Sequence, residues 1–517
     1  MAAWFLLAQA VPLESATSLP FSPLKLILLV GWACFCLYLT PRLKDNPLVP
    51  SEYESLFQVA TLLGGPLVIL VLVLTDTRAS ARDKSFWDRL KDAMLGTMGV
   101  KPMPVEESGL QLFDANGAEL SRLYGHGEAG PGDRHVLAMT VQIIEEAVRQ
   151  RASDILIDPK DHTSYAVRLR VDGALRTLRI LPAATSRAVL NSVKAVSSMD
   201  LAERRRPQDG AFTARKGDTS VSFRVASSGA LNGEKLSIRI LNQNAGRFTL
   251  ADVGIPEQQR SIILGALGKP FGMVLVCGPT GSGKTTTLYS MLNAIDRQTR
   301  NVISVEDPIE AHLPNVSQIE INAKAKITFA SSLRSILRQD PDVICVGEIR
   351  DEETAEIAVR AAQTGHLVLA TMHCDSNPTA LIRLLDLGVS PMLLSSGLSL
   401  LMTQRLVRKL CRQCKRPARL SPAAAEGFRK RGIDPGRMFQ AAGCDACGGT
   451  GYLGRLAVCD LLSVTDELRT EIANNPGLAA KLRSEGEKKS RTNLKNEAFR
   501  LVVAGITSLD EFKRVVG

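Results

Sequence analysis

Aromatic side chains are scarce in this chain of 517 residues, where they make up 5% of the sequence. Proteins that hold single-stranded nucleic acid stack its bases on aromatic side chains, so this scarcity argues against such a surface. The 10 cysteines do not form a small disulfide-dense module, which favours a reducing compartment over a secreted disulfide scaffold. Internal repeats and long low-complexity tracts are also absent. The net charge of +10 is mild for this length and does not by itself indicate a nucleic-acid partner.

A phosphate-binding loop follows a short apolar run in the middle of the chain. The run is Met273 to Cys277, and the next residues fit the pattern G-x4-G-K-[ST], ending in Lys284 and Thr285. Glycines let successive backbone N–H groups point at phosphate oxygens, and the helix expected over 286–295 adds partial positive charge. Lys284 would reach the β- and γ-phosphates of ATP, and the Thr285 hydroxyl would bind Mg²⁺. The residues expected to contact ATP are Gly278, Pro279, Thr280, Gly281, Ser282, Gly283, Lys284, Thr285 and Thr286.

Three further apolar runs, 302–305, 343–346 and 367–371, read as short strands that alternate with helices. Strands that deliver polar residues at their ends, beside a phosphate loop, predict an open α/β nucleotide-binding domain.

Candidate catalytic residues follow these strands. Hydrolysis of ATP needs a group that activates water, a metal ligand, and cations for the charge on the transferred phosphoryl group. Glu306 and Glu348 lie at strand ends where such carboxylates are needed, although either alone would more often be a surface or capping acid. His366 and His373 bracket the last strand, and composition leaves their role open between structure and catalysis.

Two Cys-x2-Cys pairs, Cys411 with Cys414 and Cys444 with Cys447, are separated by residues 415–443. Paired thiolates at this spacing suit a closed tetrahedral Zn²⁺ site. Four thiolates leave no open coordination position, so the metal would stabilise a subdomain and take no part in catalysis. Disulfides are the alternative, which a reducing compartment disfavours.

The first 80 residues contain two apolar runs, 24–39 and 56–74. The second is long enough to cross a bilayer as a helix, and the first suffices if Lys25 reaches the interface. Basic residues after the second run would keep that end in the cytoplasm, so the two helices (about 24–40 and 56–75) predict a membrane hairpin. A cleaved signal peptide and two buried soluble helices are the alternatives.

A smaller α/β domain is expected between the hairpin and the nucleotide-binding domain. A helical pattern over 136–151 precedes alternating patterns at 154–157 and 165–171, and further strands are expected at 221–225 and 235–240. Residues 86–134 resemble a linker that is rich in glycine, proline and aspartate in places.

Several long motifs together resemble one family, the secretion ATPases of type II secretion and type IV pilus assembly. Residues 278–288 resemble its Walker A loop, 305–310 its Asp box, 337–351 its atypical Walker B motif and 364–373 its His box. The resemblance covers roughly residues 135–517 and includes the segments 201–210 and 448–455. One departure is Asp460, where the family has glutamate after the Gly-Tyr-x-Gly-Arg motif.

The resemblance implies a homohexamer in which a PAS-like α/β domain closes over ATP held by a RecA-like domain. Arg224 and Arg239 match positions that supply arginines to the nucleotide, and an arginine on the phosphoryl group can change the rate by about 10³–10⁵. The implied partner is the inner-membrane platform protein of a pilus or secretion machine. The basic strip 405–419 would face either anionic lipid or solvent.

We therefore expect an ATP-hydrolysing hexameric motor for pilus-like fibre assembly or type II secretion, anchored in the bacterial inner membrane with its ATPase domain in the cytoplasm. A RecA-like motor that translocates nucleic acid and a membrane scaffold that binds ATP without hydrolysing it are the alternatives. The expected domains are the membrane hairpin (1–85), the linker (86–134), the smaller α/β domain (135–248), the RecA-like domain (249–405), the zinc module (406–460) and a helical C-terminal region (461–517).

Overall fold

The computed structural model describes Trp32 and residues 109–120, 131–217, 219–241, 246–322, 324–430, 432–475 and 477–517. The chain divides into two units, Met1–Glu106 and Glu107–Gly517, and every helix and strand named below belongs to the second. Apart from Trp32, the predicted membrane hairpin lies outside the described residues. Among the helices that are described, none combines the length and the apolar character that crossing a bilayer requires.

The first part of this unit is a seven-stranded antiparallel sheet with strand order β1-β5-β6-β7-β2-β3-β4. Its elements are β1 (Gln111–Phe113), α6 (Pro131–Arg149), β2 (Ala152–Pro159), β3 (Ser164–Val171), β4 (Ala174–Pro182), α7 (Ala183–Val196), β5 (Gln208–Lys216), β6 (Thr219–Ala230) and β7 (Gly233–Ile240). The structure places β1 within the segment predicted as linker, and adds β4 and β5 to the strands predicted.

Alternation along the strands explains how this sheet forms its core. In β3 every second residue is buried, from Tyr165 through Val167 and Leu169 to Val171. Side chains of a strand point alternately to the two faces of a sheet, so these four lie on one face. Residues of α6 and α7, including Ile143 and Leu190, belong to the same buried cluster. One face of the sheet is therefore covered by two helices.

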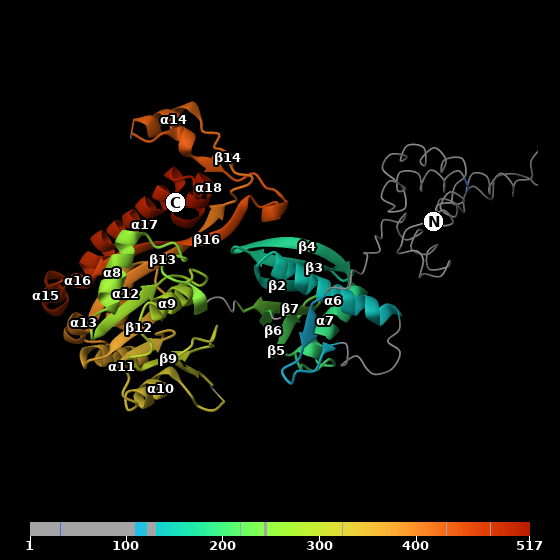
Figure 1. Ribbon diagram of the computed structural model, residues 1–517, viewed down its shortest axis with the longest axis horizontal. Coiled ribbons are helices and arrows are strands. Elements are labelled where there is room, and N and C mark those ends of the chain that lie inside the picture. Colours follow the sequence, from blue (N-terminus) through green and yellow to red (C-terminus); the bar gives the residue numbers. More distant parts are fainter. Residues whose placement is uncertain are drawn as a thin grey trace, which may run out of the picture. The chain divides into compact units, whose positions relative to one another are not determined.

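The second part is an α/β domain around a seven-stranded sheet with order β10-β9-β11-β12-β8-β13-β16, in which only the β13–β16 pairing is antiparallel (Figure 1). Its elements are α8 (Glu257–Leu267), β8 (Gly272–Cys277), α9 (Lys284–Asn293), β9 (Val302–Glu306), β10 (Ser317–Glu320), α10 (Phe329–Ile336), β11 (Val343–Val346), α11 (Glu352–Gln363), β12 (Leu367–Met372), α12 (Asn377–Asp386), α13 (Pro391–Gly397), β13 (Leu398–Leu410) and β16 (Tyr452–Ser463).

The central strand β8 is buried over its whole length. Met273, Leu275 and Cys277 belong to a core cluster with residues of α11 and α12, whereas Val274 and Val276 belong to a cluster with residues of α8 and α9. The two faces of β8 are therefore covered by different helices, which is why this strand reads as a continuous apolar run. The predicted open α/β nucleotide-binding domain is confirmed at this level.

The cysteine pairs lie in an insertion between β13 and β16. Because these strands pair over most of their length within the main sheet, the boundaries expected at 405 and 460 fall inside strands. The insertion contains β14 (Arg416–Pro417), α14 (Pro422–Arg429), η6 (Pro435–Arg437), β15 (Phe439–Gln440) and η7 (Asp445–Cys447).

Helices follow the sheet at the C-terminus, as predicted. They are α15 (Asp466–Asn474), α16 (Leu478–Lys481), η8 (Leu482–Gly486), α17 (Glu487–Val503) and α18 (Leu509–Val516). The side chains of α17 and α18 pack against Val407 of β13 and Val458 of β16.

A buried charge network attaches α18 to β13. The Glu511 side chain is fully buried and accepts hydrogen bonds from the backbone N–H and the guanidinium of Arg408, and from the Arg514 guanidinium. Burial acts to raise the pKa of Glu511, but the hydrogen bonds from Arg514 and Arg408 outweigh it and hold the pKa at about 2. The folded pKa lies below the usual glutamate value, so this carboxylate stabilises the fold at neutral pH.

We expect Glu511→Gln to lower the free energy of unfolding by about 3 kcal/mol at pH 7, because it leaves Arg408, whose side chain is 19% exposed, and the more exposed Arg514 without their counter-charge. The difference from wild type should shrink as the pH falls from about 4 towards 2, since the wild-type carboxylate is protonated there. Urea unfolding followed by circular dichroism across this pH range measures both effects.

Glu426→Gln is the matched control, because the Glu426 side chain is 55% exposed and pairs with Arg429 at the surface. Its effect should stay within about 0.5 kcal/mol. A Glu511→Gln chain that unfolds at the wild-type urea concentration would show that the network does not stabilise the fold.

Candidate active site and cysteine cluster

The predicted phosphate-binding loop follows β8, which lies between β12 and β13. Cys277, the last residue of β8, pairs with Met372 of β12 and Thr403 of β13, and the Gly278 N–H donates to the Met372 carbonyl at 3.3 Å. The residues after β8, β11 and β12 therefore gather at the carboxyl edge of the sheet, which is where ligands bind in open α/β folds.

Two glycines of the loop adopt backbone conformations that other residues rarely adopt. Gly283 has a φ of 85° and precedes α9, which begins at Lys284. A Cβ atom on Gly278 would lie 2.4 Å from the Ser282 hydroxyl and 2.7 Å from the Gln404 carbonyl oxygen. Gly283 thus needs glycine for its backbone conformation, and Gly278 needs it because a side chain would not fit.

The Lys284 ammonium is held inside the loop. Its Nζ donates to the carbonyl oxygens of Gly278 (2.9 Å) and Pro279 (3.2 Å), and lies 3.3 Å from Nδ1 of His373. Burial lowers the pKa of Lys284, and the charge of Glu348 opposes this effect. The loop thus holds its cation beside a negative charge.

A chain of polar contacts links Lys284 to the end of β11. Nε2 of His373 lies 3.1 Å from Oε1 of Glu348, and the other carboxylate oxygen of Glu348 lies 2.7 Å from the Arg350 guanidinium. The Lys284 ammonium can only donate, so Nδ1 of His373 accepts, and Nε2 carries the proton that it donates to Glu348. His373 thus links the loop lysine to the carboxylate at the end of β11.

Glu306 lies at the end of β9 and is 3% exposed. Its carboxylate accepts hydrogen bonds from the Tyr289 hydroxyl, from Ser304 Oγ at 2.6 Å and from Gln318 Nε2 at 3.1 Å. Burial, with the charge of Glu306 beside it, raises the pKa of Tyr289. Protein donors therefore surround this buried carboxylate, whereas the Glu348 side chain, which pairs with His373 and Arg350, is 14% exposed.

His366 lies at the opposite edge of the sheet from the loop. It directly precedes β12, and its backbone carbonyl accepts from Gly272 at the start of β8. Nδ1 of His366 lies 3.0 Å from the Ala361 carbonyl oxygen. The length of β12 separates it from His373 by on the order of 20 Å. Within one chain, the structure does not bring His366 to the phosphate-binding loop.

Arg224 and Arg239 face each other on β6 and β7. Arg224 pairs with Glu320 at 3.3 Å, and Arg239 pairs with Asp154 at 3.3 Å. Among the described residues, neither arginine makes a hydrogen bond to the phosphate-binding loop. Burial raises the pKa of Glu310, and the charges of Arg239 and Arg224 oppose this, so both arginines act electrostatically on the segment after β9.

No sequence motif identifies two further residues of the site. Tyr289 lies within α9 and Gln404 within β13, and each contacts the site through a buried side chain. Only the packing of α9 and β13 around the loop identifies them.

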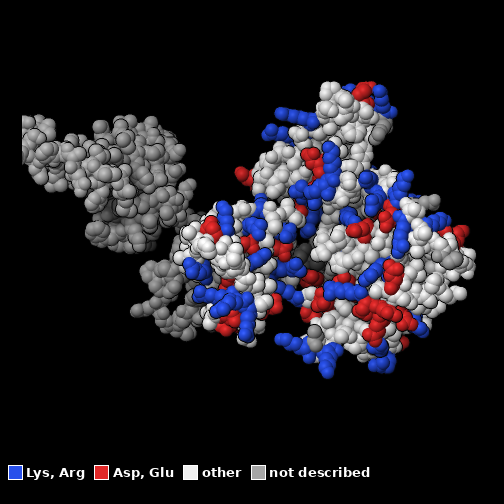
Figure 2. Space-filling model, turned by 180° about the vertical axis from the view of Figure 1, so that it is seen from behind, with Lys and Arg blue, Asp and Glu red and all other residues white. Residues whose placement is uncertain are grey.

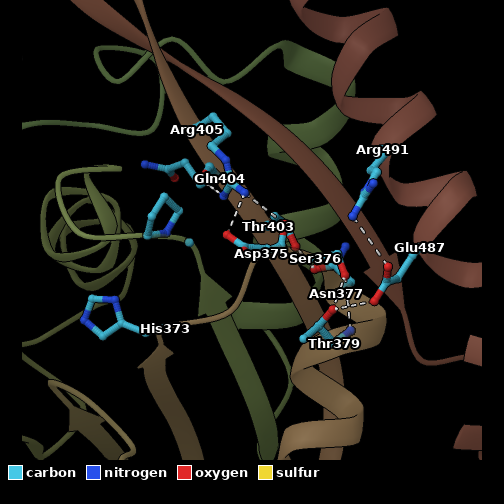
Figure 3. A network of polar contacts seen from close by, with 12 residues as sticks. His373, Asp375, Ser376, Asn377, Thr379, Thr403, Gln404, Arg405, Glu487 and Arg491 are labelled. Atoms are coloured by element: carbon cyan, nitrogen blue, oxygen red, sulfur yellow. Dashed lines mark hydrogen bonds and ion pairs between the residues drawn. The ribbon is translucent and has the colours of Figure 1, made fainter. Parts of the chain in front are cut away.

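Behind the loop, a polar network fixes β13 and α12 (Figure 3). The Thr403 hydroxyl donates to Oδ1 of Asn377 at 2.7 Å, and the Asn377 amide donates to the buried Asp460 at 3.0 Å. Two residues after Thr403 on β13, Arg405 pairs with Asp375 at 3.0 Å.

The four cysteines predicted as zinc ligands converge. The sulfur atoms of Cys411, Cys414, Cys444 and Cys447 all lie within 4.8 Å of one another. The sulfur pairs Cys411–Cys444, Cys414–Cys447 and Cys444–Cys447 are 3.8, 3.8 and 3.7 Å apart. Zn–S bonds of about 2.3 Å in a tetrahedron place the sulfur atoms about 3.8 Å apart, so the spacing fits one metal ion and no disulfide. Backbone N–H groups of Gly443, Cys444 and Gly451 point at these sulfurs, as suits thiolates.

Comparisons with known proteins agree with this site. A model of the family described as "Type II/IV secretion system protein" matches residues 131–514. Type II secretion system protein E of Pseudomonas aeruginosa is 41% identical over 386 residues, which cover 74% of this chain and 76% of that protein. The type IV pilus assembly ATPase PilB of Acinetobacter baylyi is 39% identical over 379 residues, covering 72% of this chain and 65% of PilB.

Solved structures show the same fold. The pilus retraction motor PilT with bound ADP is 27% identical, with a TM-score of 0.50, and the match covers 72% of this chain and 95% of PilT. The Legionella pneumophila ATPase DotB has a TM-score of 0.54 and covers 72% and 94%. At 21% identity, DotB supports the fold alone. With a phosphate-binding loop, a strand-end carboxylate beside it and these relatives, the chain belongs to the type II/IV secretion system protein family and is an ATPase.

Proposed function

We propose that the chain is the hexameric, ATP-hydrolysing motor of a type II secretion or type IV pilus assembly machine at the bacterial inner membrane. The observation that carries this proposal is the chain of contacts Lys284–His373–Glu348 beside the loop. A nucleotide-binding scaffold without turnover would not need a carboxylate and a histidine in that position. The named relatives include both secretion and pilus assembly proteins, which supports the class of machine.

In the proposed reaction, Lys284 leaves its carbonyl partners and binds the β- and γ-phosphates, where it stabilises negative charge. Glu348 orients the attacking water and accepts its proton, and His373 holds Glu348 from one side while Arg350 holds it from the other. Glu306 accepts hydrogen bonds from Tyr289, Ser304 and Gln318. It thereby holds the end of β9 against α9 and β10.

Mg²⁺ fits the start of α9. The Thr285 hydroxyl is half-buried there, and it makes no hydrogen bond to any described residue. When bound, the metal would neutralise charge on the β- and γ-phosphates.

The ring supplies the groups that one chain does not bring to the loop. In the proposed hexamer, Arg224, Arg239 and His366 reach the nucleotide by closure of the smaller α/β domain or from a neighbouring subunit. Both side chains of the Arg224–Glu320 pair are at least 39% exposed, and both side chains of the Arg239–Asp154 pair are at least 15% exposed. Rearranging these ion pairs therefore costs little. Closure and reopening would move the platform protein in the membrane.

Zinc completes the proposed cofactors, since the four sulfur atoms fit one tetrahedral ion. The membrane anchor rests on the predicted hairpin. In the basic strip 405–419, Arg405, Arg408 and Lys415 each have partners inside the protein. Arg412, Arg416 and Arg419 are exposed, so only this part of the strip could face lipid. On the face drawn in Figure 2, Lys and Arg are interspersed with Asp and Glu, and no nucleic-acid partner is proposed.

Lys284→Ala and Glu348→Gln should each lower ATP turnover by about 10²-fold or more, because each removes a charge that acts on the reacting phosphoryl group or water. Phosphate release by the purified chain measures this, and circular dichroism checks the fold. Glu353→Gln, at a surface pair with Arg334, is the control and should keep wild-type turnover. Near-wild-type turnover in both site variants would refute the assignment of the site.

The purified wild-type chain should contain about one zinc per chain. Cys414→Ser should lose the metal and lower the melting temperature, because the insertion then loses the metal bonds that join its two cysteine pairs. Elemental analysis measures the metal, and Cys345→Ala, at a buried cysteine outside the cluster, should retain it. A wild-type chain that binds no zinc would contradict the site.

Removal of residues 1–80 should move the chain from the membrane fraction to the soluble fraction while ATP turnover persists. Apolar runs that cross a bilayer hold a protein in the pellet through alkaline washes, so fractionation of both forms tests the anchor. Recovery of both forms in the soluble fraction would remove the anchor from the proposal.

A further inference from the structure

Gln404 lies level with the first residue of the phosphate-binding loop. It belongs to β13, which runs parallel to β8, and its neighbour Thr403 pairs with Cys277, the residue before the loop. The Gln404 side chain is 1% exposed. A buried amide is costly unless its polar atoms are paired, so its partners show what it does.

Both ends of the Gln404 amide bind the loop and its helix. Nε2 donates to the Ser282 carbonyl oxygen at 2.7 Å, and Oε1 accepts from the Thr287 hydroxyl at 2.8 Å. Ser282 precedes Lys284 in the loop, and Thr287 follows it in the first turn of α9. One side chain therefore holds the chain on both sides of the lysine.

The contact with Ser282 determines the direction of a backbone N–H. In a trans peptide, the carbonyl and the N–H of the next residue point in opposite directions. With the Ser282 carbonyl turned towards Gln404, the Gly283 N–H points away from β13. Among the described residues this N–H has no hydrogen-bond partner, as expected for a donor reserved for a phosphate oxygen.

The strand that carries Gln404 is itself fixed. Thr403 donates to Asn377, and Asn377 donates to Asp460, which also accepts from Ser490 at 2.5 Å and Asn493 at 2.8 Å in α17. Figure 3 shows Gln404 next to Thr403 on β13. The glutamine is therefore held in place by a packed and hydrogen-bonded support.

We propose that Gln404 is a positioning residue of the ATPase reaction. It fixes the Ser282–Gly283 peptide so that the loop presents its N–H groups to the phosphates before ATP arrives. This inference rests on the proposed ATP site. It assigns Gln404 no contact with the nucleotide, because its buried amide is directed at Ser282 and Thr287.

Gln404→Met removes both contacts at similar side-chain size. It should raise KM for ATP and lower kcat/KM by about tenfold or more, which is the equivalent of losing the hydrogen bond from the Gly283 N–H to a charged phosphate oxygen. Full-length wild type and variant are compared in steady-state ATP turnover and in binding of fluorescent ADP. Thr403→Val is the matched control. It breaks the neighbouring buried contact with Asn377, so it should lower the melting temperature with a smaller change in KM.

Gln404→Glu supplies a second readout, which also serves if the methionine variant does not fold. A protonated glutamic acid has the shape of glutamine and donates to the Ser282 carbonyl, whereas the carboxylate repels it. Burial raises the pKa of such an acid, so kcat/KM relative to wild type should fall as the pH rises from 6 to 9. The ratio for Gln404→Met should stay flat over this range.

The role of Gln404 would be overturned if KM and the ADP dissociation constant of Gln404→Met stayed within twofold of wild type. It would also be overturned if kcat/KM of Gln404→Glu, relative to wild type, did not change with pH. In both cases normal turnover by the wild-type chain would leave the proposed function intact. A wild-type chain without turnover would refute the proposed function instead. The comparison of ADP binding between wild type and Gln404→Met would then still decide whether Gln404 shapes the loop.

Discussion

The ATP site depends on the pairing of β8 between β12 and β13. This ladder places the phosphate-binding loop, the His373 segment and Gln404 at one edge of the sheet, because Cys277 pairs with both Met372 and Thr403. A shift of one residue in either pairing would turn the side chains of β8 to the wrong faces. The two core clusters, which divide the residues of β8 between them, therefore fix the register as well as the fold.

Buried charges and amides in this domain have partners that match their chemistry. Lys284 lies among carbonyl oxygens, Glu306 receives three donors, and Glu511 receives two guanidinium groups. Removing one partner from such a group costs more than the bond itself, because the other remains buried without compensation. Glu348 differs in that its side chain is 14% exposed, which leaves it accessible to water and substrate.

Much of the nucleotide-binding domain is predictable from sequence, since strands buried on both faces read as continuous apolar runs and the loop has a fixed spacing. Residues 273–277, 302–305, 343–346 and 367–371 all form strands. The cysteine cluster also follows from spacing, since two close pairs meet when the chain between them folds back. The strands β1, β4 and β5 carry weaker patterns, because part of each faces solvent.

Other features depend on contacts that no local pattern encodes. Gln404 and Tyr289 reach the site only because β13 and α9 pack beside the loop. The domain limits expected at 405 and 460 cut β13 and β16, because the spacing of cysteines marks the metal module but says nothing about which flanking residues pair in a sheet. His366 and His373 are similar in sequence setting, yet a strand separates them.

The β13–β16 pairing makes the cysteine module the tip of a long hairpin. The ladder continues from Leu400 opposite Ser463 to Leu410 opposite Tyr452, so the ends of the module are held together by main-chain bonds whether the tip is long or short. Lengthening a closed tip costs little, since each doubling of a loop adds only about 0.6 kcal/mol. Chains of this architecture can thus gain or lose material at this point through evolution while the nucleotide pocket keeps its shape.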